Sequence, residues 1–300
     1  MRRLSVCVLS VVAVIGSASV AQATFPGRNG TIVFAARPPG ELKSLRQIEP
    51  DGTGFRHLIP RGTGEDRAPA WSPDGTTLAF ASGRSGNLDI WTVKPYSGLS
   101  PVNLTETPGV DELLPTWSPA GRIAFTSQVI GGDAATIDVM DANGANRTSI
   151  ASLDAPVSLE WSPTGARIAY AVIVGGSRNI YSIRPDGSGL VLLASGLPRA
   201  VIYDVRPDGR RILFQGGATT TNGLYEIAVG GDHHIRRLTD PPAHVVDEHA
   251  SYSPNGRKIV FVRRGRSGDS LWLMRADGTF EHVLKGFALL RAYGISWRPL

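Results

Sequence analysis

Carboxylate and imidazole side chains gather in short segments that each lead up to a recurring aromatic or apolar anchor residue. Such groups bind cations and move protons, so together they could bind a cationic peptide segment or a divalent ion. A loop that leads into a buried strand is also polar simply because it is solvated, and both interpretations stay open. The candidate residues for partner binding are Asp66, Asp111, Glu112, Asp247, Glu248 and His249, with Arg199 and Arg291 in the corresponding segments elsewhere.

One of these segments contains several possible metal ligands. His244, Asp247 and His249 place three nitrogen or oxygen donors within six positions. Their spacing matches no helical or zinc-finger pattern, and the segment is long enough to be a solvated loop. The sequence therefore predicts no metal and no other cofactor, and leaves Asp247 and His249 as weak candidate ligands.

Two serine-containing segments come nearest to the sequence around a hydrolytic nucleophile. Residues 83–87 (GRSGN) and 265–269 (GRSGD) both lack the final glycine of a nucleophile elbow. The glycine pairs at 175–176 and 216–217 fall at strand ends, and no helix that could hold a phosphate follows them. No catalytic residue is predicted.

A repeat of about 45 residues organises the chain around these segments. Its anchor positions, at intervals of 44 to 47 residues, are Trp71, Trp117, Trp161, Val205, Tyr252 and Trp297. Most anchors are followed by a sequence such as Ser-Pro-Asp-Gly, which fits a type I turn. Because the aromatic anchors recur at equivalent places, they are predicted to pack in the core or between repeats rather than to form a carbohydrate-binding surface.

Each repeat continues with apolar strands. In residues 78–81, large Leu78 and Phe80 alternate with small alanines, so a large face of one repeat can meet a small face of the next. A later strand ends at Asp-Gly or Asn-Gly, which is a hairpin signal, and a short fourth strand follows. Four strands per repeat with apolar residues on both faces predict an all-β fold, a β-propeller of six four-stranded blades.

The two ends of the chain complete this count. Residues 30–60 contain the second, third and fourth strands of a repeat, and residues 293–299 form a first strand without its second. The C-terminal strand is therefore predicted to join the N-terminal blade and close the ring. Closure of this kind covers sheet edges that an open array would expose.

The turn sequence Trp-Ser-Pro-Asp-Gly, the strand at 78–81 (LAFA) and the later strand at 90–93 (IWTV) resemble the TolB-like propeller repeat family. The resemblance covers residues 25–300 and implies a propeller outside the cytoplasm. In TolB itself, the propeller accompanies an N-terminal α/β domain and meets a peptidoglycan-associated lipoprotein. Here the first blade is expected directly after an export signal, so the propeller is expected without that domain.

Residues 1–23 are typical of a secretory signal peptide, with two arginines, an apolar core and an Ala-Gln-Ala cleavage site, which leaves residues 24–300 as the propeller. The apolar core is shorter than the roughly 20 residues that span a bilayer, so no stable membrane span is expected after cleavage. An uncleaved anchor is the alternative.

The only cysteine, Cys7, lies in this signal, so the mature chain can form no disulfide. Removal of the two signal arginines leaves 29 of the 31 basic residues, against 26 acidic residues. This near balance of charge argues against nucleic-acid binding.

These observations predict a periplasmic or secreted scaffold that binds a protein or peptide partner and performs no catalysis. One alternative is a propeller enzyme of the lyase or lactone hydrolase type, with a metal-assisted site at the mouth of the central channel. A second alternative is a component of a Tol-type complex.

Overall fold

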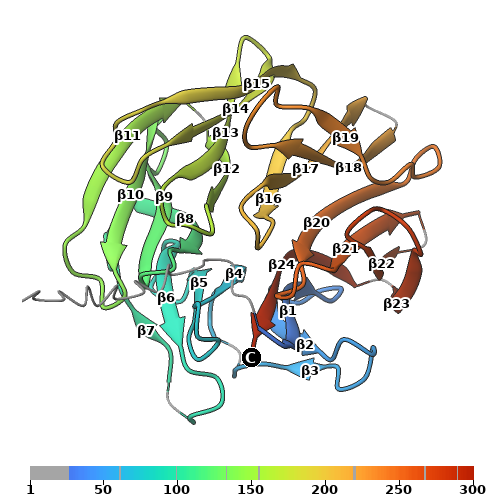
Figure 1. Ribbon diagram of the computed structural model, residues 1–300. Helices are drawn as coiled ribbons and strands as arrows, with labels where there is room; N and C mark the ends of the chain where they lie inside the picture. The colour runs from blue at the N-terminus through green and yellow to red at the C-terminus, as the bar shows by residue number, and fades with distance from the viewer. Residues whose placement is uncertain are drawn as a thin grey trace, which may run out of the picture.

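The computed structural model describes residues 27–60, 62–98, 100–132, 134–154, 156–218, 221–266, 268–288 and 290–300. Over this part of the chain every regular element is a β-strand, and the strands form a propeller around a central axis (Figure 1). The predicted signal at residues 1–23 lies outside the described residues. None of the described segments is a helix long and apolar enough to cross a membrane.

Each blade has its innermost strand at the axis and its last strand at the rim. The first blade contains β24 (Arg291–Pro299), β1 (Asn29–Arg37), β2 (Ser44–Ile48) and β3 (Arg56–His57). The second contains β4 (Asp66–Trp71), β5 (Leu78–Ser82), β6 (Asp89–Val93) and β7 (Val102–Asn103). The third contains β8 (Val110–Trp117), β9 (Arg122–Val129), β10 (Ala134–Asp141) and β11 (Thr148–Asp154).

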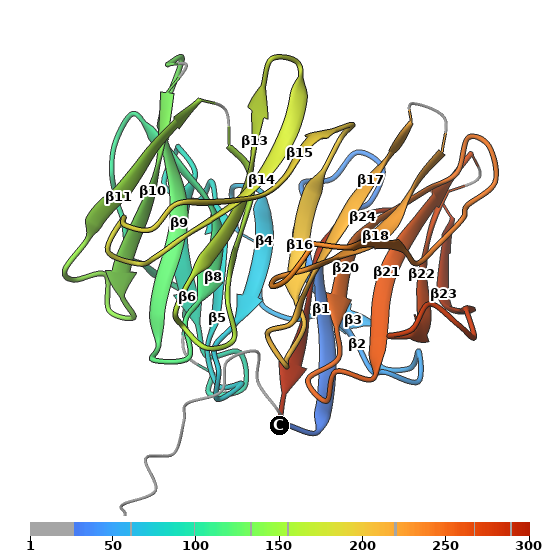
Figure 2. The same cartoon turned by 45° about the horizontal axis from the view of Figure 1, so that its top comes forward.

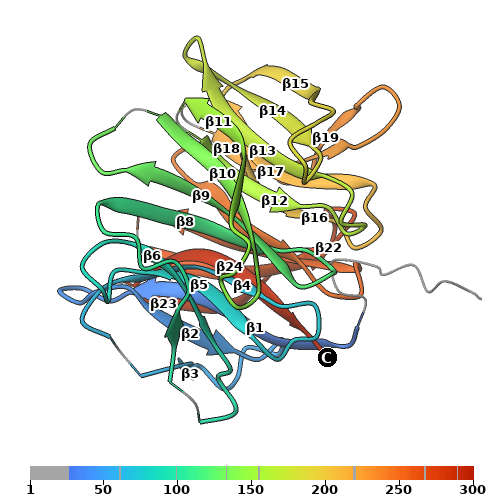
Figure 3. The ribbon, with the colours of Figure 1, turned by 90° about the vertical axis from the view of Figure 1, so that its left-hand side faces the viewer.

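The chain continues around the ring in the same order. The fourth blade contains β12 (Pro156–Trp161), β13 (Ile168–Val174), β14 (Ser177–Ile183) and β15 (Val191–Leu197). The next four strands are β16 (Val201–Val205), β17 (Arg211–Ala218), β18 (Thr221–Ala228) and β19 (Ile235–Arg237). The last four are β20 (Val246–Tyr252), β21 (Lys258–Gly265), β22 (Gly268–Arg275) and β23 (His282–Ala288). Figures 1 and 3 place β3 and β15 at opposite rims of the ring.

The prediction of a propeller with four-stranded blades is confirmed, with one difference in how the sheets are separated. Four blades are separate four-stranded sheets, whereas the units β16–β19 and β20–β23 belong to one eight-stranded sheet. They are joined by a single parallel pair, Asn222 on β18 and Val246 on β20. The six predicted units are therefore present as five hydrogen-bonded sheets, because the connection after β19 brings the start of β20 alongside β18.

The predicted closure of the ring is confirmed. Strand β24 pairs antiparallel with β1, and Trp297 lies opposite Ile32. The backbone hydrogen bonds continue past the strand, since Arg28 and Leu300 exchange bonds of 2.9 and 3.0 Å. The indole N–H of Trp297 donates to the carbonyl of Gly30 at 2.9 Å. The first blade thus combines both ends of the chain, as Figure 2 shows for β24 beside β1.

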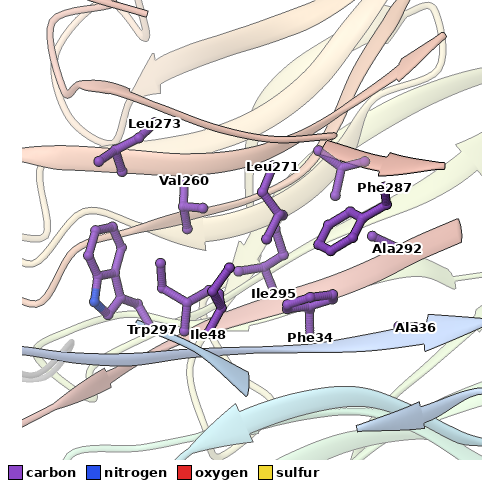
Figure 4. Close-up of a cluster of buried hydrophobic side chains, with 12 residues drawn as sticks. Phe34, Ala36, Ile48, Val260, Leu271, Leu273, Phe287, Ala292, Ile295 and Trp297 are labelled. Atoms are coloured by element: carbon purple, nitrogen blue, oxygen red, sulfur yellow. The ribbon is translucent and has the colours of Figure 1, made fainter. Parts of the chain in front are cut away.

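Large and small side chains alternate between neighbouring blades as predicted. Leu78 and Phe80 pack toward the first blade with Val33. The opposite face of β5, with Ala79, packs toward the third blade with Phe125. Figure 4 shows an equivalent cluster between the last and first blades, in which Trp297 and Phe34 meet side chains of β21 and β22. The core is therefore a ring of interfaces between blades.

The turn after the first anchor, Trp71, shows why its sequence recurs. The N–H of Gly75 donates to the carbonyl of Ser72 at 2.9 Å, and the carboxylate of Asp74 accepts from the N–H of Thr76 at 3.0 Å. Gly75 has a φ of 64°, and a Cβ placed there would lie 2.1 Å from the carbonyl oxygen of Pro299. The predicted role of this motif in the turn is confirmed, and the turn also rests against the closing strand.

Candidate functional site

The innermost strands carry a β-bulge near their middle, and this irregularity positions the channel-lining side chains. The residue three positions before the anchor has a positive φ in four of these strands. The values are 46° at Ala68, 56° at Leu114, 49° at His249 and 40° at Gly294. The pairing register shifts at each of these places. Positive φ is costly for residues other than glycine, and such strain is often found at functional sites. The channel wall is therefore the first place to look for a site.

A cavity of about 320 Å³ lies on the propeller axis. All six innermost strands contribute to its wall, and the loop before β2 adds Lys43. The end of the cavity nearest the starts of these strands, called the mouth below, is lined by Arg67, Tyr293 and His249. Glu160 and Asp204 line the cavity further along their strands. Cavities of this size bind small ligands or a few side chains of a partner.

The predicted residues Asp66 and Asp247 occupy the same place in their repeats and have the same environment. Each is almost completely buried, and each carboxylate is bound by an arginine of its own blade. Arg84 donates to Asp66 at 2.8 Å. Arg263 donates to both oxygens of Asp247, at 2.7 and 2.8 Å. In the described structure, these two carboxylates hold a blade together rather than face a ligand.

Glu112 holds the equivalent place in the third blade, and it is also buried. Arg147 donates to it at 2.9 Å and also bonds Asp138. Burial raises the pKa of Glu112, although Arg147 opposes that shift. Its neighbour Asp111 accepts the backbone N–H of Leu88 at 2.9 Å, which ties the third blade to the second.

Two of the other predicted residues, Glu248 and Arg291, lie at the side of the mouth formed by the last blade. Glu248 forms an ion pair with Arg264, which also bonds Asp269 at 3.1 Å. Arg291 lies 3.2 Å from the same aspartate. Burial raises the pKa of Glu248, and the Arg264 guanidinium lowers it in part. Arg199 is exposed in the loop before β16 with a φ of 60°, so it stands apart from this group.

His249 lines the axial cavity, whereas Asp247 does not. The imidazole packs between Tyr203 and Tyr293, with ring centroids 5.6 and 5.8 Å away. Burial, followed by the Arg264 guanidinium, lowers the pKa of His249 to about 3, so the ring is neutral at physiological pH. Among the described side chains, no group of three or more His, Cys, Asp or Glu residues is placed to hold a metal ion.

Two channel carboxylates, Glu160 and Asp204, were missed at the level of sequence. They come from adjacent blades and stand directly before their anchors. Glu160 accepts from Thr116 at 2.5 Å. Asp204 accepts from the N–H of Tyr252 at 2.7 Å and from Ser251 at 3.1 Å. The repeat alignment contained a signal for them, because the residue before the anchor is polar in every repeat except the one with Ala70.

The environment of this pair favours protonation. Burial raises the pKa of Asp204 to about 7. Burial and the nearby Asp204 charge raise the pKa of Glu160 well above its usual range. Two buried carboxylates that repel each other retain a proton more readily than either would alone.

A cationic cluster at the mouth was also missed. Arg37, Lys43 and Arg67 all surround the single carboxylate of Glu65, at 3.7, 3.6 and 2.6 Å. The Lys43 ammonium also lies 4.4 Å from the centre of the Tyr293 ring. No local pattern marks this cluster, because β1, β4 and β24 meet only when the ring has closed.

The propeller fold, the internal repeats and the axial cavity define a repeat protein of the propeller class. The family model described as the TolB beta propeller domain matches residues 44–237, and the chain belongs to this family.

Comparisons with individual proteins agree with this assignment. The chain is 31% identical over 158 residues to the Tol-Pal system protein TolB of Bordetella pertussis, a match that covers 52% of this chain and 35% of the relative. It therefore matches about a third of the length of that relative. Among solved structures, TolB from Acinetobacter baumannii has a TM-score of 0.77 at 20% identity, covering 90% of this chain and 67% of the other. A putative TolB from Agrobacterium tumefaciens has a TM-score of 0.68 at 21% identity, covering 91% and 100%. At these identities the structural matches establish the fold.

Proposed function

We propose that the mature protein is an exported propeller scaffold that binds a protein or peptide partner in the cell envelope or outside the cell. The observation that carries the proposal is the axial cavity, to which all six innermost strands contribute. Its wall combines aromatic, cationic and acidic side chains, which suits a few side chains of a polypeptide. The protein acts by binding, and no catalytic step is part of the proposal.

Two further observations support an extracytoplasmic partner. The sequence of residues 1–23 is typical of a cleaved export signal, so the mature chain would begin near Thr24. The relatives with the matching propeller are named as Tol-Pal system proteins. The shared region is about a third of those relatives, so membership of a Tol complex is a narrower hypothesis than partner binding.

The metal-assisted enzyme is the less favoured candidate for a physical reason. Both oxygens of Asp247 accept hydrogen bonds from Arg263, so a metal ion would have to compete with this arginine. His249 faces the axial cavity and stacks with tyrosines instead. The two candidate ligands therefore have separate structural surroundings, and we propose binding rather than catalysis.

Crosslinked capture from envelope extracts tests the proposal with two matched variants. Tyr203 lines the cavity, so Tyr203→Ala should reduce recovery of a specific partner at least several-fold. Phe280, which is 66% exposed in a hairpin turn between β22 and β23, provides the control substitution Phe280→Ala. The wild-type protein and the control should recover the same partner. Failure to recover a specific partner, or equal losses in the two variants, would contradict partner binding through the cavity.

A further inference from the structure

The acidic residues at the channel mouth are already neutralised by the protein itself. Asp66 and Asp247 are buried beside Arg84 and Arg263, at distances of 2.8 and 2.7 Å. A cationic partner would have to displace these arginines before it could reach either carboxylate. The charge of the partner is therefore better inferred from charged side chains that the protein itself neutralises only in part.

The cluster at the mouth between the first and second blades has an excess of positive charge. Three cations, Arg37, Lys43 and Arg67, share the carboxylate of Glu65. One negative charge against three positive charges leaves two in excess at this point of the rim. The shortest contact, 2.6 Å, belongs to Arg67, so the carboxylate is mainly engaged by that arginine.

Lys43 is the least satisfied of the three cations. Its side chain is only 14% exposed, yet its nearest anionic partner is 3.6 Å away. An ammonium group has three N–H donors, and here it faces one distant carboxylate and the face of Tyr293. Burial, followed by the nearby Arg67 charge, lowers the pKa of Lys43, and the Glu65 carboxylate offsets this shift only in part. Both Lys43 and Arg67 line the axial cavity.

Among the described residues, the charges on the other sides of the mouth have partners of their own. On the side of the last blade, Glu248 and Asp269 are matched by Arg264 and Arg291. The channel carboxylates Glu160 and Asp204 stand three residues further along their strands than the repeat place of Arg67. That separation corresponds to about 10 Å along a strand. An anion at the mouth would therefore meet the cations first.

We propose that this cationic corner of the mouth binds carboxylate side chains from an acidic segment of the partner, with Lys43 and Arg67 as the contacting residues. The inference rests on the proposed partner-binding function and specifies the chemistry of the partner. A carboxylate would complete the ammonium shell of Lys43 with a charge-assisted hydrogen bond. The rings of Tyr293 and His249 beside it would pack on the apolar part of an acidic side chain.

Fluorescence anisotropy with defined peptides tests this inference on the purified full-length protein. The probe is a fluorescein-labelled hexaglutamate with an amidated C-terminus, and its counterpart is the corresponding hexalysine. Hexaglutamate should bind more tightly than hexalysine. Lys43→Gln and Arg67→Gln should each weaken hexaglutamate binding about tenfold, the loss expected for one charge-assisted hydrogen bond. Lys43→Arg, which keeps the charge, should restore most of the affinity.

The matched control is Lys285→Gln, which makes the same change of charge on the exposed outer strand β23. This variant should bind hexaglutamate within twofold of the wild-type protein. The inference is overturned if hexalysine binds as tightly as hexaglutamate, if neither peptide binds, or if Lys285→Gln weakens binding as much as Lys43→Gln. Equal melting midpoints of all variants will show that each one is folded.

Partner capture separates a failure of this inference from a failure of the proposed function. If the Lys43→Gln, Arg67→Gln double variant captures the partner as well as the wild-type protein, the function stands and the acidic-segment inference is wrong. If the wild-type protein captures no partner, the proposed function itself fails, whatever the peptides do.

Discussion

At the residue scale, the channel carboxylates Glu160 and Asp204 are distinguished by pKa values that burial raises. Asp204 is 8% exposed, and its neighbours are hydrogen-bond donors rather than cations. Two other buried carboxylates, Asp66 and Asp247, each have an arginine partner. Without such a partner, burial favours the protonated form of Asp204. The channel is therefore expected to change its charge near neutral pH.

The pKa of Asp204 leads to a prediction for stability against pH. Its folded value of about 7 lies above the ordinary value of 3.8, so its protonated form stabilises the fold. This contribution is complete below about pH 4 and is lost as pH rises through about 7. As the pH rises from about 4 to about 7, the free energy of unfolding of the wild type should fall relative to that of Asp204→Asn, by at most about 1.4 kcal/mol per pH unit.

Urea unfolding of both proteins between pH 4 and 8 measures this difference. The variant also loses one acceptor for the Tyr252 and Val205 N–H groups, so only the change with pH is diagnostic. Parallel stability curves across the whole range would show that Asp204 is not protonated in the folded protein.

A second prediction concerns the buried ion pair of Asp247 and Arg263. Arg263→Met would leave the fully buried carboxylate without its guanidinium partner, and loss of one member of such a pair costs about 3–5 kcal/mol. The exposed pair of Arg122 and Asp141, 3.7 Å apart, provides the matched change Arg122→Met, which should cost no more than about 1 kcal/mol. Chemical denaturation measures both. Similar losses in the two variants would contradict a structural role for the buried pair.

At the scale of elements, the innermost strands have two separate tasks. Their anchor ends pack between blades, as Trp71 and Trp297 do. Their bulged middles direct side chains such as His249 into the channel. A regular strand would alternate strictly between the two neighbouring blades, so the bulge is what allows one strand to serve the core and the cavity.

The closing strand is expected to contribute strongly to stability. Deletion of residues 293–300 removes the buried Ile295 and Trp297 together with most of the pairing to β1. Loss of one large buried side chain costs about 3–5 kcal/mol, so the melting midpoint should fall by more than about 10 °C. Val102→Ala, at a site 57% exposed, serves as the control and should leave the midpoint nearly unchanged. Thermal unfolding followed by circular dichroism measures both, and an unchanged midpoint in the truncated protein would contradict a stabilising closure.

At the scale of the whole molecule, the ring brings together groups that are distant in sequence. Lys43, Glu65 and Tyr293 belong to the first and second blades and meet at one edge of the mouth. Glu160 and Asp204 meet across the interface of the fourth and fifth blades. Each blade alone presents only a fragment of the wall. The candidate site is therefore a property of the closed ring.

The sequence by itself determined the propeller, its four-stranded units and its closure. These features follow from local physics: turn residues recur after each anchor, and large and small side chains alternate along residues 78–81. The split first repeat was visible because residues 293–299 lack a following strand. The join between β18 and β20 was not visible, since it depends on one backbone pair that a connecting loop brings together.

Only the tertiary structure decided which charged side chains are already neutralised by a neighbour and which could bind a partner. The sequence singled out Asp66, Glu112 and Asp247 as candidate residues for partner binding, but it could not show that arginines of the same blades bind them. It likewise could not show that Lys43 and Arg67 share one carboxylate. Residue type determines what a side chain can bind, whereas the packing of blades around the axis determines which partners lie within a few ångströms and which groups stay uncompensated.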